Sequence, residues 1–194
     1  MPQKRFLSPE HLYFVTVNTQ DRYPYFEEEI FCDLWIEELK VCKQLKPFKL
    51  YAFCLIPDHF HMLVQCDEGP NISEVMQFFK RHFSRNANII MNDQIPVTDI
   101  GQCRLQINNE NESIIGLFDQ KIMHLQSLFH KKHTIKFDIP KLKWQKSFHD
   151  HVIRDEEDLV HHFNYTQFNF QKHDLPQNWK YTSLNFEDLI DPIE

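Results

Sequence analysis

Glycine is scarce in this sequence, with three copies among 194 residues. Phosphate-binding loops need several glycines at fixed spacing, because only a bare backbone approaches a phosphate closely. Neither the Walker pattern nor the dinucleotide-binding fingerprint occurs in the chain. The sequence therefore argues against nucleotide-hydrolysing enzymes with a P-loop and against Rossmann-type dehydrogenases.

Long apolar runs are also missing, and none approaches the roughly 20 residues that a membrane-spanning helix requires. The N-terminus, Met1 to Arg5, leads into a polar stretch, so we expect no secretory signal. The cysteines are odd in number and lack CxxC spacing, which predicts reduced core thiols in a cytoplasmic protein without membrane contact. They are Cys32, Cys42, Cys54, Cys66 and Cys103.

A strongly basic composition is absent too, since the formal net charge is −7. This charge argues against a protein that merely coats nucleic acid. Residues 131–146, however, carry six lysines against one acid, Asp138. The segment is either a local basic face or an ordinary solvated charge run.

The periodicity of apolar residues predicts alternating strands and helices. Asn71, followed by Glu74, predicts a capping box at one helix start, and Asp155 predicts an N-cap at another. The order indicates an α+β fold of the ferredoxin-like βαββαβ type, an antiparallel sheet with helices on one face. A helical insertion and a C-terminal helix complete it, and the tail after Pro176 is expected to pack loosely. The strands are expected at 12–19, 48–56, 59–66 and 144–153, and the helices at 26–45, from 71 onward, at 113–131 and at 155–172.

His59 and His61 are the most distinctive pair of residues in the chain. On a strand, residues two apart point the same way, with side chains roughly 7 Å apart along the chain. Two imidazoles placed in this way can bind one cation. Alone the pattern is weak, because a chain with 12 histidines contains such pairs by chance.

Three separated segments make the pair more specific. Residues 51–64 read YAFCLIPDHFHMLV, an apolar strand followed by Pro, Asp, His, an apolar residue, His and a second apolar strand. Residues 144–154 begin with Trp-Gln, and residues 162–173 carry Tyr165 with Asn169 four positions later. In this order the segments resemble the HUH motif, the Trp-Gln segment and the tyrosine helix of single-tyrosine transposases, including the REP-associated ones.

The resemblance implies a metal-dependent nuclease and strand transferase acting on single-stranded DNA. Tyr165 would be the nucleophile and would form a 5′-phosphotyrosine, while His59, His61 and Asn169 would bind Mg²⁺ or Mn²⁺. On a continuous helix, Tyr165 and Asn169 share one face with Lys172, which would neutralise a phosphate or assist the phenol.

The resemblance also implies a DNA partner, most simply a hairpin, and leaves a homodimer open. Besides Lys172, we expect DNA to be bound by Lys80, Arg81, Arg85 and Lys146. The match covers about residues 10–85 and 143–183. The chain is therefore expected to form one domain over 1–194, with an insertion at about 86–142.

The match has departures, which keep two other hypotheses open. The family usually has Pro and Gly near the end of the tyrosine helix, where this chain has Phe170 and Asp174. A domesticated hairpin-binding protein with weak or no catalysis fits these departures. A third hypothesis is an unrelated metallohydrolase, with His149 or His151 as the third ligand and Tyr165 only structural.

Overall fold

The computed structural model describes residues 11–66, 70–92, 112–134 and 138–193. Cys103, Lys136 and residues 93–111 of the expected insertion lie outside this part of the chain. The other four cysteines are buried free thiols, as predicted. None of the described helices is long and apolar enough to cross a membrane.

Four strands form one antiparallel sheet in the order β2-β3-β1-β4. They are β1 (Leu12–Asn18), β2 (Phe48–Ile56), β3 (His59–Cys66) and β4 (His149–Val152). The predicted α+β, ferredoxin-like sheet is confirmed, with β2 and β3 matching their expected bounds. The fourth strand is shorter than expected, because the segment before it joins the sheet only through a single bridge between Trp144 and Thr19.

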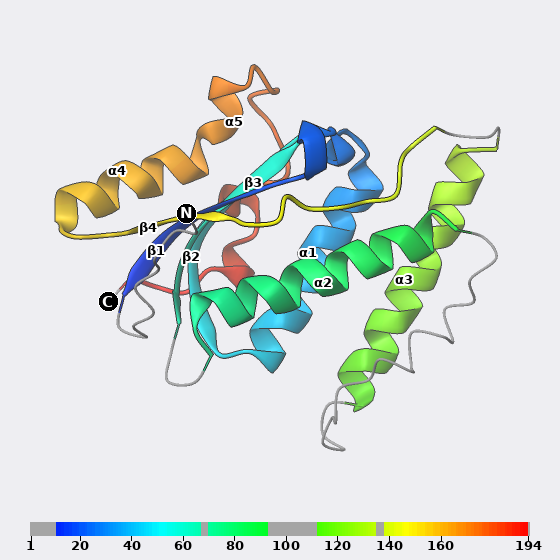
Figure 1. Ribbon diagram of the computed structural model, residues 1–194, viewed down its shortest axis with the longest axis horizontal. Helices are drawn as coiled ribbons and strands as arrows, with labels where there is room; N and C mark the ends of the chain where they lie inside the picture. Colours follow the sequence, from blue (N-terminus) through cyan, green and yellow to red (C-terminus); the bar gives the residue numbers. More distant parts are fainter. Residues whose placement is uncertain (1–10, 67–69, 93–111, 135–137, 194) are drawn as a thin grey trace.

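Helices cover both faces of this sheet (Figure 1). On one face lie α1 (Glu29–Leu45), α2 (Ile72–Ile90) and α3 (Glu112–Lys132), which contact one another. On the other face α4 (Glu156–Gln167) and the short α5 (Asn169–Lys172) rest on β2, and α4 also contacts β3. Short 3-10 turns occupy Gln20–Arg22, Tyr25–Glu27, Ser183–Asn185 and Glu187–Leu189.

Aromatic packing fills the space between the sheet and the first group of helices. Trp35 of α1 is fully buried and meets Phe53, Phe60 and Phe79 at ring-centroid distances of 5.0–5.4 Å. Trp144, from the predicted Trp-Gln segment, packs on Phe60 from the other side, at 5.6 Å. Offset and edge-to-face pairs of this kind add to the hydrophobic gain of burial. The Trp-Gln segment is therefore anchored in the main core.

Helix caps follow the predicted residues. The Asn71 side chain accepts hydrogen bonds from the backbone N–H groups of Ser73 and Glu74, and the Glu74 carboxylate accepts one from the Asn71 N–H. Asp155 accepts a hydrogen bond from the Asp158 N–H at the start of α4. These bonds satisfy N–H groups that a helix start otherwise leaves without partners.

The last helix is not continuous to Lys172, contrary to the prediction. It breaks at Phe168, where the backbone leaves the helical conformation and α5 begins one residue later. The Thr166 hydroxyl donates a hydrogen bond to the His162 carbonyl, and the Thr182 hydroxyl donates one to the Gln167 carbonyl. Side chains that bind helix carbonyls in this way bend or end a helix.

The C-terminal tail packs tightly, so the expectation of loose packing was wrong. Tyr181 is 1% exposed, and its carbonyl accepts a hydrogen bond from the Leu55 N–H. Asp191 accepts hydrogen bonds from Lys43 and from the Leu50 N–H, at 2.5 and 2.6 Å. The tail thus covers the edge of β2, whose backbone groups would otherwise lack partners.

A buried carboxyl links α1 to α2. Glu38 is 2% exposed and accepts a hydrogen bond from the Asn86 amide. Burial, the largest cause, raises the pKa of Glu38 from 4.5 to about 8, while Asn86 and Arg85 oppose the shift. The folded chain therefore keeps this group protonated at neutral pH, whereas the unfolded chain ionises it.

We expect Glu38→Gln to stabilise the protein most at high pH. Above the pKa that Glu38 has in the unfolded chain, ionisation stabilises the unfolded state, so the wild type loses stability as the pH rises. This loss continues until the pH passes the pKa of Glu38 in the folded chain, about 8. Each pKa unit corresponds to ~1.4 kcal/mol, so the gain of the variant over wild type at pH 8 should reach a few kcal/mol. Urea unfolding at pH 5 and pH 8 measures it. Equal pH dependence in both proteins would contradict the assignment of Glu38.

Candidate active site

His59 and His61 leave β3 on the face that α4 covers, because alternate residues of a strand point the same way. Both rings are 4% exposed, and their Nε2 atoms lie 3.1 Å apart. Two ligands bound to one cation at right angles, each at about 2.1 Å, stand about 3.0 Å apart. The pair therefore has the separation that a shared cation requires.

The other ring nitrogens are held by neighbouring side chains. Nδ1 of His59 lies 2.6 Å from the Asp58 carboxylate, which can only accept, so Nδ1 carries the proton and Nε2 is the unprotonated nitrogen that faces His61. Nδ1 of His61 lies 2.8 Å from the hydroxyl of Thr16, its partner across β1 and β3. Arg22 in turn pairs with Asp58 at 3.2 Å. Partners of this kind orient imidazoles that bind metal ions.

Burial makes both imidazoles poor bases. Burial is the largest cause of the lowered pKa of His59, and the nearby Asp58 carboxylate partly opposes this shift. The pKa of His61 lies well below its usual value because of burial first and then the charges of His59, His173 and Arg22. Both rings are therefore neutral at neutral pH, which is the form that binds a metal ion.

Asn169 lies at this site with an amide that lacks well-formed hydrogen bonds. Its side chain is close enough to His61 to oppose the fall in the pKa of that ring. The residue is fully buried, yet within the described residues neither Oδ1 nor Nδ2 makes a hydrogen bond of good geometry. A buried amide without partners costs free energy, and a cation bound to its oxygen removes part of that cost. The residues thus fit a divalent cation held by two imidazoles and one amide oxygen.

Tyr165 approaches the histidine pair from α4. Its ring lies 5.3 Å from that of His61 and 5.6 Å from Phe14, edge-on to both. The ammonium of Lys172 lies 4.1 Å from the centre of the Tyr165 ring. The break at Phe168 therefore does not separate the residues that the sequence grouped together, since Tyr165, Lys172 and His61 all meet here.

Several residues at the site were missed by sequence reasoning. Phe14 stacks on His61 at 5.2 Å, and Thr16 and Arg22 act on the histidines as described above. His173 places its ring 5.0 Å from that of His59. Phe14 and Thr16 lie two residues apart on β1, so both point to the face of the sheet that carries His61. A predicted pairing of β1 with β3 would therefore have identified them. Arg22 gives no such signal.

The two departures from the family pattern have local explanations. Phe170 is 3% exposed and packs with Cys54 and Ile56, so its ring fills the space beneath α5. Asp174 has a φ of 53°, in the left-handed region that favours glycine, but aspartate tolerates this conformation better than most residues.

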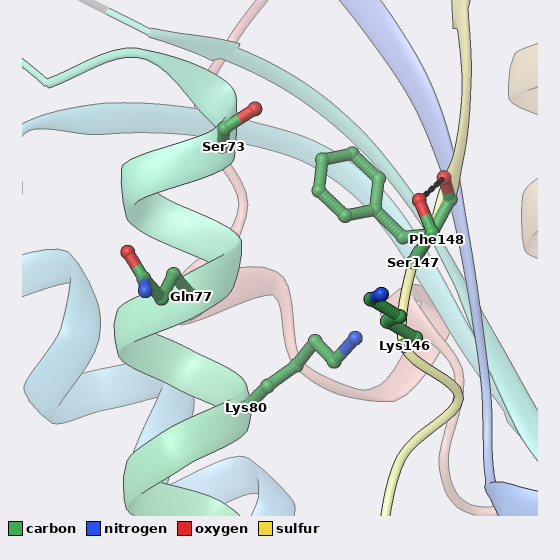
Figure 2. A pocket seen from close by; sticks show the side chains of 6 residues that line it. All are labelled: Ser73, Gln77, Lys80, Lys146, Ser147 and Phe148. Carbon is green, nitrogen blue, oxygen red and sulfur yellow. Dashed lines mark hydrogen bonds between the residues drawn. The ribbon is translucent and has the colours of Figure 1, made fainter. Parts of the chain in front are cut away.

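The predicted DNA-binding residues fall into separate places. Lys80 of α2 and Lys146, before β4, face each other across a pocket of about 360 Å³ (Figure 2). Arg81 is exposed and Arg85 half-buried further along α2. Lys172 lies beside Tyr165 on the opposite face of the sheet. The pocket is lined by Ser73, Gln77, Lys80, Lys146, Ser147 and Phe148.

Backbone contacts connect this pocket to the histidines. The Lys80 ammonium donates to the Gln145 carbonyl at 2.9 Å, and the Gln145 N–H donates to the Asn18 carbonyl at 3.0 Å. Asn18 is the partner of His59 in the pairing of β1 with β3. The basic pocket and the histidine pair are therefore joined through the Trp-Gln segment.

Known proteins match this sequence along most of its length. Residues 8–95 match the family described as Transposase IS200 like. A candidate REP-associated tyrosine transposase of Haemophilus influenzae is 26% identical over 178 residues, which cover 90% of this chain and 80% of the relative. Together with the three motifs, these matches support the IS200-like, single-tyrosine transposase family for this chain. Transposases of this family generally use a divalent metal ion.

A solved structure supports the fold. A REP-associated tyrosine transposase bound to a REP hairpin aligns with a TM-score of 0.54 and 17% identity, over 98% of this chain and 88% of the other. At that identity the match concerns the fold. The resemblance inferred from the three motifs is thus confirmed at the level of family and fold.

The geometry also bears on the metallohydrolase hypothesis. His149 is exposed, and His151 forms hydrogen bonds with Asp158 instead of reaching the histidine pair. Within the described residues, no third His, Cys, Asp or Glu offers a ligand atom close to both His59 and His61. A third ligand at this site is therefore more readily an amide than a histidine.

Proposed function

We propose that this transposase family member cuts and rejoins single-stranded DNA at hairpins, with Tyr165 as its nucleophile. The observation that carries the proposal is the meeting of Tyr165 with two neutral histidines and a buried, unpaired amide. These groups come from three elements, β3, α4 and α5, and packing of the fold alone does not require them to be adjacent. The H. influenzae relative and the hairpin-bound structure support the choice of substrate.

The reaction is a transesterification that conserves the number of phosphodiester-like bonds. The Tyr165 oxygen forms a bond to phosphorus and loses its proton, and the bond from phosphorus to the 3′ oxygen breaks. That oxygen leaves as a 3′-OH, and the 5′ phosphate remains on the tyrosine. A 3′-OH can reverse the step and join the strand. Because the covalent link stores the bond energy, no ATP is needed, in keeping with the lack of a P-loop.

A divalent cation, Mg²⁺ or Mn²⁺, would be held by His59, His61 and Asn169 and would polarise the scissile phosphate. The chain's own residues supply the rest. Asp58 and Thr16 fix the direction of the two imidazoles. Lys172, above the Tyr165 ring, adds positive charge where the phosphate accumulates negative charge.

The Lys80–Lys146 pocket is proposed to hold a flanking part of the same DNA. Two ammonium groups attract phosphates, and the Phe148 side chain adds an aromatic wall. Hydrogen bonds through Gln145 and Asn18 connect the backbone beside this pocket to the strand pair that carries His59. Arg81 and Arg85 extend the positive charge along α2.

We expect Lys80→Ala combined with Lys146→Ala to weaken binding of a single-stranded hairpin and to reduce its dependence on salt. If each lysine contacts one phosphate, the slope of log K against log salt should fall by about 1.4. Fluorescence anisotropy at several salt concentrations measures it. Lys121→Ala, on the exposed side of α3, is the matched control and should leave the slope unchanged. An unchanged slope in the double variant would remove these lysines from the interface.

A cleavage assay tests the proposed function. End-labelled single-stranded hairpins from the flanks of the protein's own gene are incubated with the purified protein, with and without Mn²⁺ or Mg²⁺. We expect a metal-dependent species that migrates as protein plus DNA on a denaturing gel. Tight binding without this species under any metal would favour the second hypothesis, a domesticated hairpin-binding protein.

A further inference from the structure

The chain turns back from β4 into α4 at the edge of the sheet (Figure 1). A second histidine-rich cluster joins these two elements. It contains His151 of β4 together with Asp158 and His162 of α4. Nε2 of His151 lies 2.8 Å from the Asp158 carboxylate, and Nδ1 of His162 lies 2.9 Å from it. The two imidazole rings stack at 4.5 Å, with an angle of 19° between their planes. Three groups that bind metal ions thus converge from two elements.

The carboxylate at the centre of the cluster is held in place. The Arg154 N–H donates to one of its oxygens at 3.1 Å, and the N-cap Asp155 fixes the backbone of Asp158. Burial acts to raise the pKa of Asp158, but hydrogen bonds from His151 and from the Arg154 N–H, with the nearby imidazoles, lower it below its usual value. One ligand atom of each of the three residues lies within 4.8 Å of those of the other two. All three side chains are partly exposed, so an ion could enter from solvent.

We propose that His151, Asp158 and His162 bind a second metal ion, of the zinc type, separate from the cation at His59 and His61. Two imidazoles and one carboxylate form a donor set that zinc accepts, with water in the fourth position. Ligands around tetrahedral zinc stand about 3.3 Å apart, so small side-chain rotations complete the set. The ion would replace the proton that now joins His151 to the carboxylate, and it would take Nδ1 of His162 from its hydrogen bond with the Asp158 backbone carbonyl.

This second ion would fix the tyrosine helix on the sheet. His162 lies one turn before Tyr165, and its ring contacts Phe14 at 4.7 Å. Phe14 also touches both Tyr165 and His61. A clamp between β4 and α4 therefore limits the movement of the nucleophile relative to the first site. The proposal rests on the cluster alone and stands whether or not the protein cuts DNA.

Zinc binding by the full chain tests the proposal, in a background that lacks the first site. The background carries His59→Ala and His61→Ala, and zinc is titrated in competition with a chromogenic chelator. We expect this protein to bind one Zn²⁺ and to melt at a higher temperature when it does. Loss of partners around metal ligands typically weakens metal binding 10–100-fold, so Asp158→Asn, which removes a direct ligand, should weaken it at least ~100-fold. It should also abolish the rise in melting temperature.

His149→Ala and His161→Ala are the matched controls, since both histidines are exposed neighbours outside the cluster. They should keep the zinc affinity of the background. If Asp158→Asn fails to fold, His151→Ala provides the second test, with Co²⁺ absorption bands reporting the loss of an imidazole ligand. Equal zinc affinity in the background, Asp158→Asn and His151→Ala would overturn the proposal, as would loss of binding in the controls.

Discussion

Tyr165→Phe is expected to abolish the covalent protein–DNA adduct, a fall of at least ~1,000-fold, as is typical when a nucleophile is removed. Hairpin affinity should stay close to that of wild type. The ring contacts with His61 and Phe14 and the Lys172 contact do not involve the hydroxyl oxygen that the variant lacks. The free energy of unfolding should therefore change by less than ~1 kcal/mol. Denaturing gels and anisotropy on the same hairpin measure the two quantities.

Tyr51→Phe is the matched control for this experiment. Tyr51 is buried on the same face of the sheet, in the cluster beneath α4, and its hydroxyl donates to Gln65 at 2.7 Å. Loss of that hydrogen bond should cost about 1 kcal/mol of stability without affecting adduct formation. An adduct that persists in Tyr165→Phe would show that another residue is the nucleophile. An adduct lost in both variants would point to a general effect on the fold.

The grouping of His59, His61, Tyr165 and Asn169 could be predicted from the sequence because its signals are local. His59 and His61 are two residues apart on a strand, and Tyr165 and Asn169 are four apart on what the periodicity indicated as one helix. Short spacings of this kind determine which side chains share a face. The order of strands and helices likewise predicted the sheet, since each element carried its own apolar period.

What the sequence did not reveal depends on contacts between distant residues. The break at Phe168 follows from the hydroxyl of Thr182, which reaches the Gln167 carbonyl from the tail. The packing of the tail on β2 could not be inferred from the sequence, because it depends on hydrogen bonds from Leu50 and Leu55 of β2 to Asp191 and Tyr181. Asp158, by contrast, lies seven residues after His151 and four before His162, so its pairing with both depends on the local turn between β4 and α4.

Asn169→Ala should separate the stability of the fold from metal binding. Without metal, the buried amide has no well-formed hydrogen bond, so its removal should leave the melting temperature unchanged or raise it. A buried polar group without partners costs ~1–3 kcal/mol, which offsets the small cavity that alanine leaves. With Mn²⁺, wild type should gain stability by binding the ion, and the variant should gain much less. Thermal melts with and without Mn²⁺ provide both values.

The same variant should lose most adduct formation, by roughly 100-fold or more, if the Asn169 oxygen binds the catalytic metal ion. Asn169→Asp, which keeps an oxygen at this position, should recover part of the activity. Asn164→Ala, on the exposed side of α4, is the control and should behave as wild type. A strongly destabilised metal-free Asn169→Ala protein would show that the amide supports the fold instead. Aspartate keeps an oxygen that can bind a metal ion but lacks the amide nitrogen. Recovery of activity in Asn169→Asp would therefore indicate a metal ligand, whereas a residue that only fills space beside His61 would not need that oxygen.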